Sequence, residues 1–170
     1  MKKVTLICYG KLKTPGLDLS VNEFIKRLSR YTDFEMMELK ALPIPEKSDA
    51  LRDQIPEKEG EKILELLGSQ SFKQKRGSKP ELWCLDETGV SLKTSEWAGA
   101  LKSLPLNGKN ELVVMVGGSL GHGRTLLRSA HRIVCLGPQT LSHELARLVL
   151  VEQLYRALSY NEGHPYHNEG

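Results

Sequence analysis

The chain has 170 residues, of which 39% are hydrophobic and 26% charged, and its formal net charge at pH 7 is +3. This composition excludes a disordered or fibrous chain and predicts one globular domain over residues 1–170. No apolar run approaches the length that spans a membrane, and the mild positive charge permits an anionic partner such as RNA without requiring one.

The first half of the chain alternates short apolar runs with amphipathic ones. Residues 3–10 predict a buried strand, and residues 20–31 a helix that begins with Ser20 and Glu23 as a capping box. Residues 34–39 predict a second strand. The next helix is expected over 56–67, because Pro56 should interrupt any earlier helix and Gly68 should end it.

The second half shows the same alternation. The basic stretch 69–80 is expected to be a solvated loop, although it could contact phosphates. Strands are expected at 81–87, 111–116 and 132–137, and helices at 95–104, 124–131 and 141–160. After Glu111 the strand expected at 111–116 is continuously apolar over 112–116, which is typical of a strand buried on both faces. The pattern predicts an α/β fold with a mainly parallel sheet and flanking helices.

The last predicted helix, 141–160, is apolar over much of its circumference. Such a helix must be covered on more than one side. One side should contact the sheet. The other either contacts a second copy of the chain, which would make a homodimer, or is covered within a single copy.

A glycine-rich segment, GGSLGHGRT, follows the strand 111–116. Glycine allows the backbone to approach a ligand closely. Residues 118–125 nearly match a phosphate-binding P-loop, but arginine replaces the lysine that such a loop needs, which disfavours an NTPase. A second loop, LGPQTLSHE, follows the strand 132–137, with Ser142 as an expected N-cap. The two loops form either two walls of one pocket or two ordinary turns.

Cysteine and histidine placement argues against a metal site. Cys8, Cys84 and Cys135 lie in separate apolar runs without a CxxC pair, which favours buried free thiols in a reducing, cytoplasmic compartment. All five histidines lie in the C-terminal third, two of them in the closing tail NEGHPYHNEG. They lack the short, rigid spacing of metal ligands, so we expect no metal.

Four segments together resemble the RlmH family of ribosomal RNA large-subunit methyltransferases, which belongs to the SPOUT superfamily. They are VMVGGSLG, LSHELARLVLVEQLYRA, the closing HPYH, and VTLICYGKLK at the start. The resemblance implies a trefoil-knotted α/β fold, a homodimer and S-adenosyl-L-methionine as cofactor. It also implies methylation of N3 of a pseudouridine in helix 69 of 23S rRNA, on assembled ribosomes.

The resemblance assigns roles to individual residues. The cofactor would contact Leu85, Gly117 and the segment 136–141, which comprises Leu136, Gly137, Pro138, Gln139, Thr140 and Leu141. The tail would act as a catalytic flap, with His167 as base or orienting group, Tyr166 positioning the substrate, and His164 beside them. Arg147 and Arg156 would hold RNA phosphate, the cofactor carboxylate or the tail, although Arg156 is equally placed to pair with Glu152.

Two positions depart from the family pattern. Asn168 stands where many relatives carry a basic residue, and Ser119 where many carry proline. The first departure leaves open a catalytically silent ribosome-binding module. A SPOUT methyltransferase acting on another RNA, such as transfer RNA, is the other alternative.

Overall fold

The computed structural model describes residues 3–44, 49–70, 72 and 80–164, and side chains from residue 52 onward in the helix that begins at Asp49. Within these residues the strands are β1 (Lys3–Tyr9), β2 (Asp33–Leu39), β3 (Glu81–Ser91), β4 (Glu111–Val116) and β5 (Arg132–Cys135). The helices are α1 (Leu17–Leu28), α2 (Asp49–Gly68), α4 (Thr94–Leu106), α5 (Arg124–Ser129) and α6 (His143–Asn161). The predicted alternation of strands and helices is therefore confirmed.

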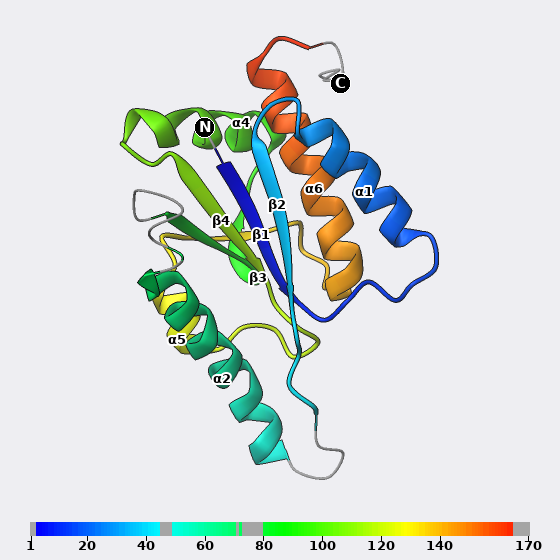
Figure 1. Cartoon of the computed structure of the whole chain (residues 1–170), viewed down its shortest axis with the longest axis vertical. Helices are drawn as coiled ribbons and strands as arrows, with labels where there is room; N and C mark the ends of the chain where they lie inside the picture. Colours follow the sequence, from blue (N-terminus) through cyan, green and yellow to red (C-terminus); the bar gives the residue numbers. More distant parts are fainter. Residues whose placement is uncertain (1–2, 45–48, 71, 73–79, 165–170) are drawn as a thin grey trace.

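The strands form one sheet in the order β2-β1-β4-β3-β5, and every neighbouring pair is parallel. The carboxyl ends of the strands therefore lie at a single edge, the lower end in Figure 1. The loops after β3, β4 and β5 meet there because these three strands are neighbours. The mainly parallel sheet predicted from the sequence is confirmed.

Helices cover both faces of the sheet (Figure 1). On one face, α1, α4 and α6 pack over a core that includes Leu6, Val114 and Trp83. On the other face, α2 and α5 cover a smaller core that includes Ile7 and Met115. All six residues of β4 are buried, as predicted, because successive side chains enter opposite cores.

Helix α6 is covered on several sides within one copy of the chain. It packs between α1 and α4 and against the sheet. An apolar portion stays outside this packing, since Leu145, Val149 and Tyr160 are 44%, 37% and 37% exposed. Internal packing therefore accounts for most of the wide apolar surface that the sequence predicted, but not for all of it.

Two predicted helix starts are wrong. Helix α1 begins at Leu17, one turn before Ser20, and its N-cap is Gly16 at a φ of 82°. Ser20 consequently lies inside the helix, where its hydroxyl bonds the Gly16 carbonyl, and Glu23 pairs with Arg27. The capping box predicted at Ser20 is absent because the left-handed turn at Gly16 starts the helix earlier.

Helix α2 begins at Asp49 and continues through Pro56, against the prediction that this proline would interrupt it. An interior proline costs roughly 3 kcal/mol, since it removes one backbone hydrogen bond and crowds the preceding turn. Packing against α5 offsets this cost, and Ile55 and Glu59 on either side of the proline are buried. The predicted end at Gly68 is confirmed.

Strand β3 runs four residues beyond its predicted end at 87. Its pairing with β5 shifts register between Leu85 and Val90, and the backbone of Gly89 lies against Val134. A Cβ at Gly89 would come within 2.5 Å of the Val134 backbone, so only glycine fits this approach. Asp86 and Glu87 lie just past Leu85, which pairs with Val116 at the end of β4 and with Val134 in β5.

Candidate functional site

A cavity of about 720 Å³ lies at the carboxyl ends of β3, β4 and β5. We call it the first cavity. Seven of the eight predicted cofactor residues line it, all except Pro138: Leu85, Gly117, Leu136, Gly137, Gln139, Thr140 and Leu141. The alternative that the two glycine-containing loops are unrelated turns is therefore excluded, because both line the same cavity.

The loop after β4 forms one wall of the first cavity. Gly118 and Gly121 pair through a backbone bridge, and Gly121 has a φ of 75°. A Cβ on Gly117 would lie 2.8 Å from the carbonyl carbon and oxygen of Gly121. Side chains are excluded at this point, so a ligand here would meet bare backbone.

The loop after β4 leads into α5, but the first backbone amides of α5 are not available to bind a phosphate. Helix α5 has six residues, and the backbone amides of Arg124 and Thr125 donate to the Glu57 carboxylate at 2.6 and 3.2 Å. The Thr125 hydroxyl, together with these two amides, lowers the pKa of Glu57. The amides that a P-loop would offer to phosphate are therefore already bonded to a side chain, which agrees with the argument against an NTPase.

The segment 136–141 forms the opposite wall. The Thr140 hydroxyl donates to Oε2 of Glu87 at 2.9 Å, which ties this segment to β3. Ser142 then caps α6 by accepting a hydrogen bond from the amide of Leu145 at 3.3 Å, as predicted. The leucines of the segment, Leu136 and Leu141, are half-buried and contact the larger core.

Four titratable residues of the lining were not predicted from the sequence: Asp86, Glu87, His122 and His143. Burial lowers the pKa of His122, while the charge of Asp86 and the carbonyl groups of Leu85 and Met115 act in the opposite direction. Burial also lowers the pKa of His143, helped by the nearby positive charge of Arg147. Asp86 and Glu87 follow Leu85, the last residue of β3 that pairs with β4, and this position was their available signal, since ligands in parallel sheets bind at the carboxyl ends of the strands.

Arg147 does not line the first cavity. Its side chain is fully buried, and its guanidinium donates to the Tyr9 carbonyl and to Oε1 of Glu38. Glu144, one turn earlier, accepts hydrogen bonds from the amides of Lys13 and Thr14. These contacts join the first turns of α6 to the ends of β1 and β2.

The tail is described only as far as His164. His164 is exposed, and its amide donates to the Ser159 carbonyl at 3.0 Å. Tyr166, His167 and Asn168 lie outside the described residues, as do residues 73–79 of the basic loop. Arg156 makes the predicted pair with Glu152, at 2.6 Å.

The cysteines behave as predicted, since Cys8, Cys84 and Cys135 are buried and free. Burial raises the pKa of Cys8 to about 11 and that of Cys84 to about 12. Across the described ranges, no three His, Cys, Asp or Glu side chains gather in a way that could hold a metal ion. Nor does any helix in the described part of the chain combine the length and the apolar character needed to cross a bilayer.

The first cavity therefore combines three kinds of surface. Bare glycine backbone offers amide and carbonyl groups, half-buried leucines offer apolar contact, and Asp86 and Glu87 offer negative charge. This set suits a ligand with a flat apolar portion, polar edges and a positive charge.

Comparisons with known proteins agree with this arrangement. The family model described as "Predicted SPOUT methyltransferase" matches residues 2–167. Proteins named ribosomal RNA large subunit methyltransferase H from Streptococcus uberis and Enterococcus faecalis are each 36% identical over 166 residues, covering 97% of this chain and 99% of theirs.

Two solved structures resemble the fold at low sequence identity. A probable methyltransferase from Bordetella pertussis matches with a TM-score of 0.51 and 18% identity, over 92% of this chain and 96% of that one. A tRNA (m1G37) methyltransferase from Aquifex aeolicus matches with a TM-score of 0.51 and 13% identity, over 99% of this chain and 75% of that one. The chain belongs to the SPOUT methyltransferases, and among them to the family of ribosomal RNA large subunit methyltransferase H.

Proposed function

We propose that this chain is an S-adenosyl-L-methionine-dependent methyltransferase of 23S rRNA. Its target is N3 of a pseudouridine in helix 69, its substrate is the assembled ribosome, and it works in the cytoplasm. Family membership and the names of the relatives support the reaction class and the type of RNA. The exact nucleotide rests on the resemblance of the glycine loop, α6 and the HPYH tail to the RlmH family.

The observation that carries the proposal is the first cavity, whose lining includes Leu85, Gly117 and all but one residue of 136–141. The residues present fit the cofactor. Leucine side chains suit the adenine faces, backbone groups at Gly117 and 136–141 suit its polar edges, and Asp86 and Glu87 suit the positive charge of the sulfonium. A volume of about 720 Å³ lies within the usual range of small-ligand sites.

The bound cofactor supplies an electrophilic methyl group. The protein must place N3 of the pseudouridine in line with it and accept the N3 proton. We assign proton acceptance or orientation to His167 and base positioning to Tyr166, with His164 beside them. Arg147 acts indirectly in this scheme, because its buried bonds to Tyr9 and Glu38 hold the first turns of α6, from which Ser142 and His143 reach the cavity.

We further propose that the chain is a homodimer in which each tail completes the partner's cavity, and that its C-terminal segment is knotted as in other SPOUT enzymes. The exposed apolar side chains of α6, Leu145 and Val149, support a dimer contact on that helix. They lie close to the cavity in sequence, since Ser142, His143 and Ala146 line it.

The deciding experiment measures transfer of labelled methyl from S-adenosylmethionine to ribosomes that lack this modification. Free 23S rRNA and bulk transfer RNA are tested in parallel. Full-length protein is compared with a chain truncated after Gly163 and with His167→Gln. Cofactor binding of each variant is measured separately by calorimetry.

We expect label on ribosomes only, with loss of transfer in the truncated chain and retained folding of α6, which ends at Asn161. Label on transfer RNA would refute the rRNA target while keeping the reaction. Cofactor binding without transfer to any RNA would instead identify a silent ribosome-binding module, with Asn168 as the first position to restore to a basic residue.

A further inference from the structure

A second cavity of about 610 Å³ adjoins the first. It lies between the first turns of α2 and the loop that leads into α5, and it is lined by Arg52, Asp53, Pro56, Glu57, Leu120, His122, Gly123 and Arg124. Leu120 and His122 line both cavities. The two cavities are thus neighbours separated by part of the glycine loop.

The second cavity exists because α2 approaches this loop closely. A Cβ on Gly123 would lie 2.6 Å from the Pro56 carbonyl oxygen and from Cα of Glu57. Glu57 is committed to the start of α5, where its two carboxylate oxygens accept the amides of Arg124 and Thr125. Asp53 is a second carboxylate in the lining, so the charged side chains at this cavity are two carboxylates and two arginines.

Two arginines supply positive charge at this cavity. Arg52 comes from α2 and Arg124 from α5, and both side chains are exposed. Among the residues that the structure describes, neither guanidinium takes part in a hydrogen bond or a close ion pair, although the charge of Arg124 acts on the Glu57 carboxylate. Planar guanidinium groups suit phosphate oxygens, which they bind through paired hydrogen bonds.

His122 adds an unsatisfied buried atom to the boundary between the cavities. Its Nε2 is inaccessible and makes no hydrogen bond of ordinary geometry to any part of the chain that the structure describes. The carbonyl groups of Leu85 and Met115 also act on this imidazole and, against the effect of burial, raise its pKa, so His122 is a polar group at the boundary between the two cavities.

We propose that the second cavity binds a nucleotide of single-stranded RNA next to the methylated one, with its phosphate between Arg52 and Arg124. Its base lies against Pro56 and Leu120 and reaches toward His122. This inference rests on the proposed function and deepens it, because it assigns a subsite for the flanking nucleotide. Unpaired RNA loops are recognised in this way, with bases turned outward and held one by one.

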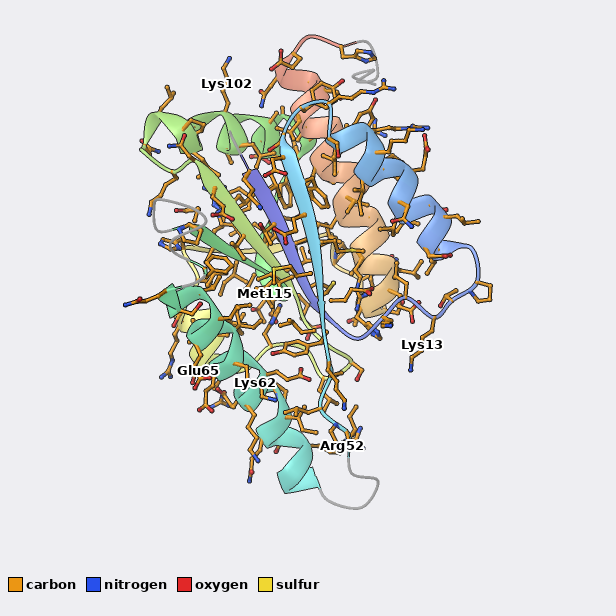
Figure 2. All side chains as sticks on the ribbon, viewed as in Figure 1. Lys13, Arg52, Lys62, Glu65, Lys102 and Met115 are labelled. Atoms are coloured by element: carbon orange, nitrogen blue, oxygen red, sulfur yellow. The ribbon has the colours of Figure 1, made fainter. Side chains whose placement is uncertain are left out.

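Charge elsewhere on the molecule provides a matched control. Figure 2 shows Arg52 near the end of the molecule where the strands terminate, whereas Lys102, on α4, lies at the opposite end. Lys102 is also exposed. Removing Lys102 takes away a positive charge without touching either cavity, so it separates a local contact from a general electrostatic effect.

The test compares wild type, Arg52→Ala/Arg124→Ala, and Lys102→Ala in methyl transfer to unmodified ribosomes at several salt concentrations. We expect the double variant to raise KM for ribosomes at least tenfold and to reduce the salt dependence of log KM by about 0.7, the value for one phosphate of a single strand. The dissociation constant for S-adenosylmethionine, measured by calorimetry, should stay unchanged. Lys102→Ala should alter KM by less than about twofold.

The same data contain the outcomes that overturn the inference. Equal effects of the double variant and Lys102→Ala would show that no subsite contacts Arg52 and Arg124. Loss of cofactor binding in the double variant would assign the second cavity to the cofactor. A wild type that transfers no methyl to ribosomes refutes the proposed function itself, which is distinct from a working enzyme that is indifferent to both arginines.

Discussion

Arg147 on α6 and Glu38 on β2 are joined by a hydrogen-bonded ion pair of 3.2 Å, and the arginine side chain has no exposed surface. The same guanidinium bonds the Tyr9 carbonyl at the end of β1. One side chain therefore fixes the start of α6 to two strand ends, and this start contributes residues to the first cavity. The RNA, cofactor or tail contact that the resemblance implies for Arg147 would have to compete with these bonds.

We expect Arg147→Ala to lower the free energy of unfolding by about 3–5 kcal/mol, because it leaves a buried carbonyl and a partly buried carboxylate without their partner. Arg156→Ala is the matched control, since it removes an arginine of the same helix whose pair with Glu152 is partly exposed. That change should cost less than about 1 kcal/mol. Urea unfolding of both variants checks this, and equal costs would contradict a structural role specific to Arg147.

Gly117 is expected to be essential to the shape of the first cavity. A Cβ there would stand 2.8 Å from the Gly121 carbonyl, and backbone cannot yield as a flexible side chain does. Gly117→Ala should therefore weaken S-adenosylmethionine binding at least tenfold. Gly99→Ala is the control, since Gly99 lies in α4 and a Cβ added to it would meet no heavy atom within 4 Å. It should leave binding unchanged and stabilise the fold by up to about 1 kcal/mol.

Sequence patterns predicted the fold wherever a single local signal decided the structure. The uniform apolar run of β4 and the Ser142 cap are examples, and both are confirmed. The patterns failed where tertiary contact overrides local preference. Pro56 stays inside α2 because α5 packs against that helix, and β3 continues past residue 87 because Gly89 lies against Val134.

In the candidate site, too, local signals predicted some residues, whereas the residues that depend on tertiary contacts were missed. The glycine loop and the segment 136–141 were predicted to be pocket walls because each follows a strand end. His122 and Glu87 were missed because nothing in the sequence indicates that a histidine between two glycines lines a cavity, or that Glu87 meets Thr140, which lies 53 residues further along the chain. The second cavity depends on the approach of α2 to Gly123, which no local pattern encodes.

The hydrogen bond between Thr140 and Glu87 is expected to hold the segment 136–141 in place for cofactor binding. Thr140→Val keeps the shape of the side chain but removes the donor, so KM for S-adenosylmethionine should rise about three- to tenfold, the equivalent of one ordinary hydrogen bond. Thr140→Ser retains a hydroxyl and should restore most of the affinity. If the valine and serine variants behave alike, the hydrogen bond does not contribute to cofactor binding.

The buried histidines predict a loss of stability in mild acid. Burial lowers the pKa of both His122 and His143 in the folded protein, whereas both titrate near about 6.5 when unfolded. Below that pH the unfolded chain takes up protons that the folded chain does not, so the free energy of unfolding should fall as pH drops from 7.5 to 5.5. Glu59, whose pKa is raised by burial, acts in the opposite direction, because the folded chain protonates it first.

Substitution of His122 tests how much this histidine contributes to the pH dependence of the free energy of unfolding. His122→Gln should flatten the decline between pH 7.5 and 5.5, because it removes one group whose protonated form is disfavoured by burial, even though Asp86 partly favours that form. Asn107→Gln, a change at an exposed position that carries no titratable group, should leave the slope as in wild type. Urea unfolding at pH 7.5, 6.5 and 5.5 measures all three proteins. A slope unchanged by His122→Gln would mean that His122 binds its proton equally well in the folded and unfolded chain, which contradicts the lowering of its pKa by burial.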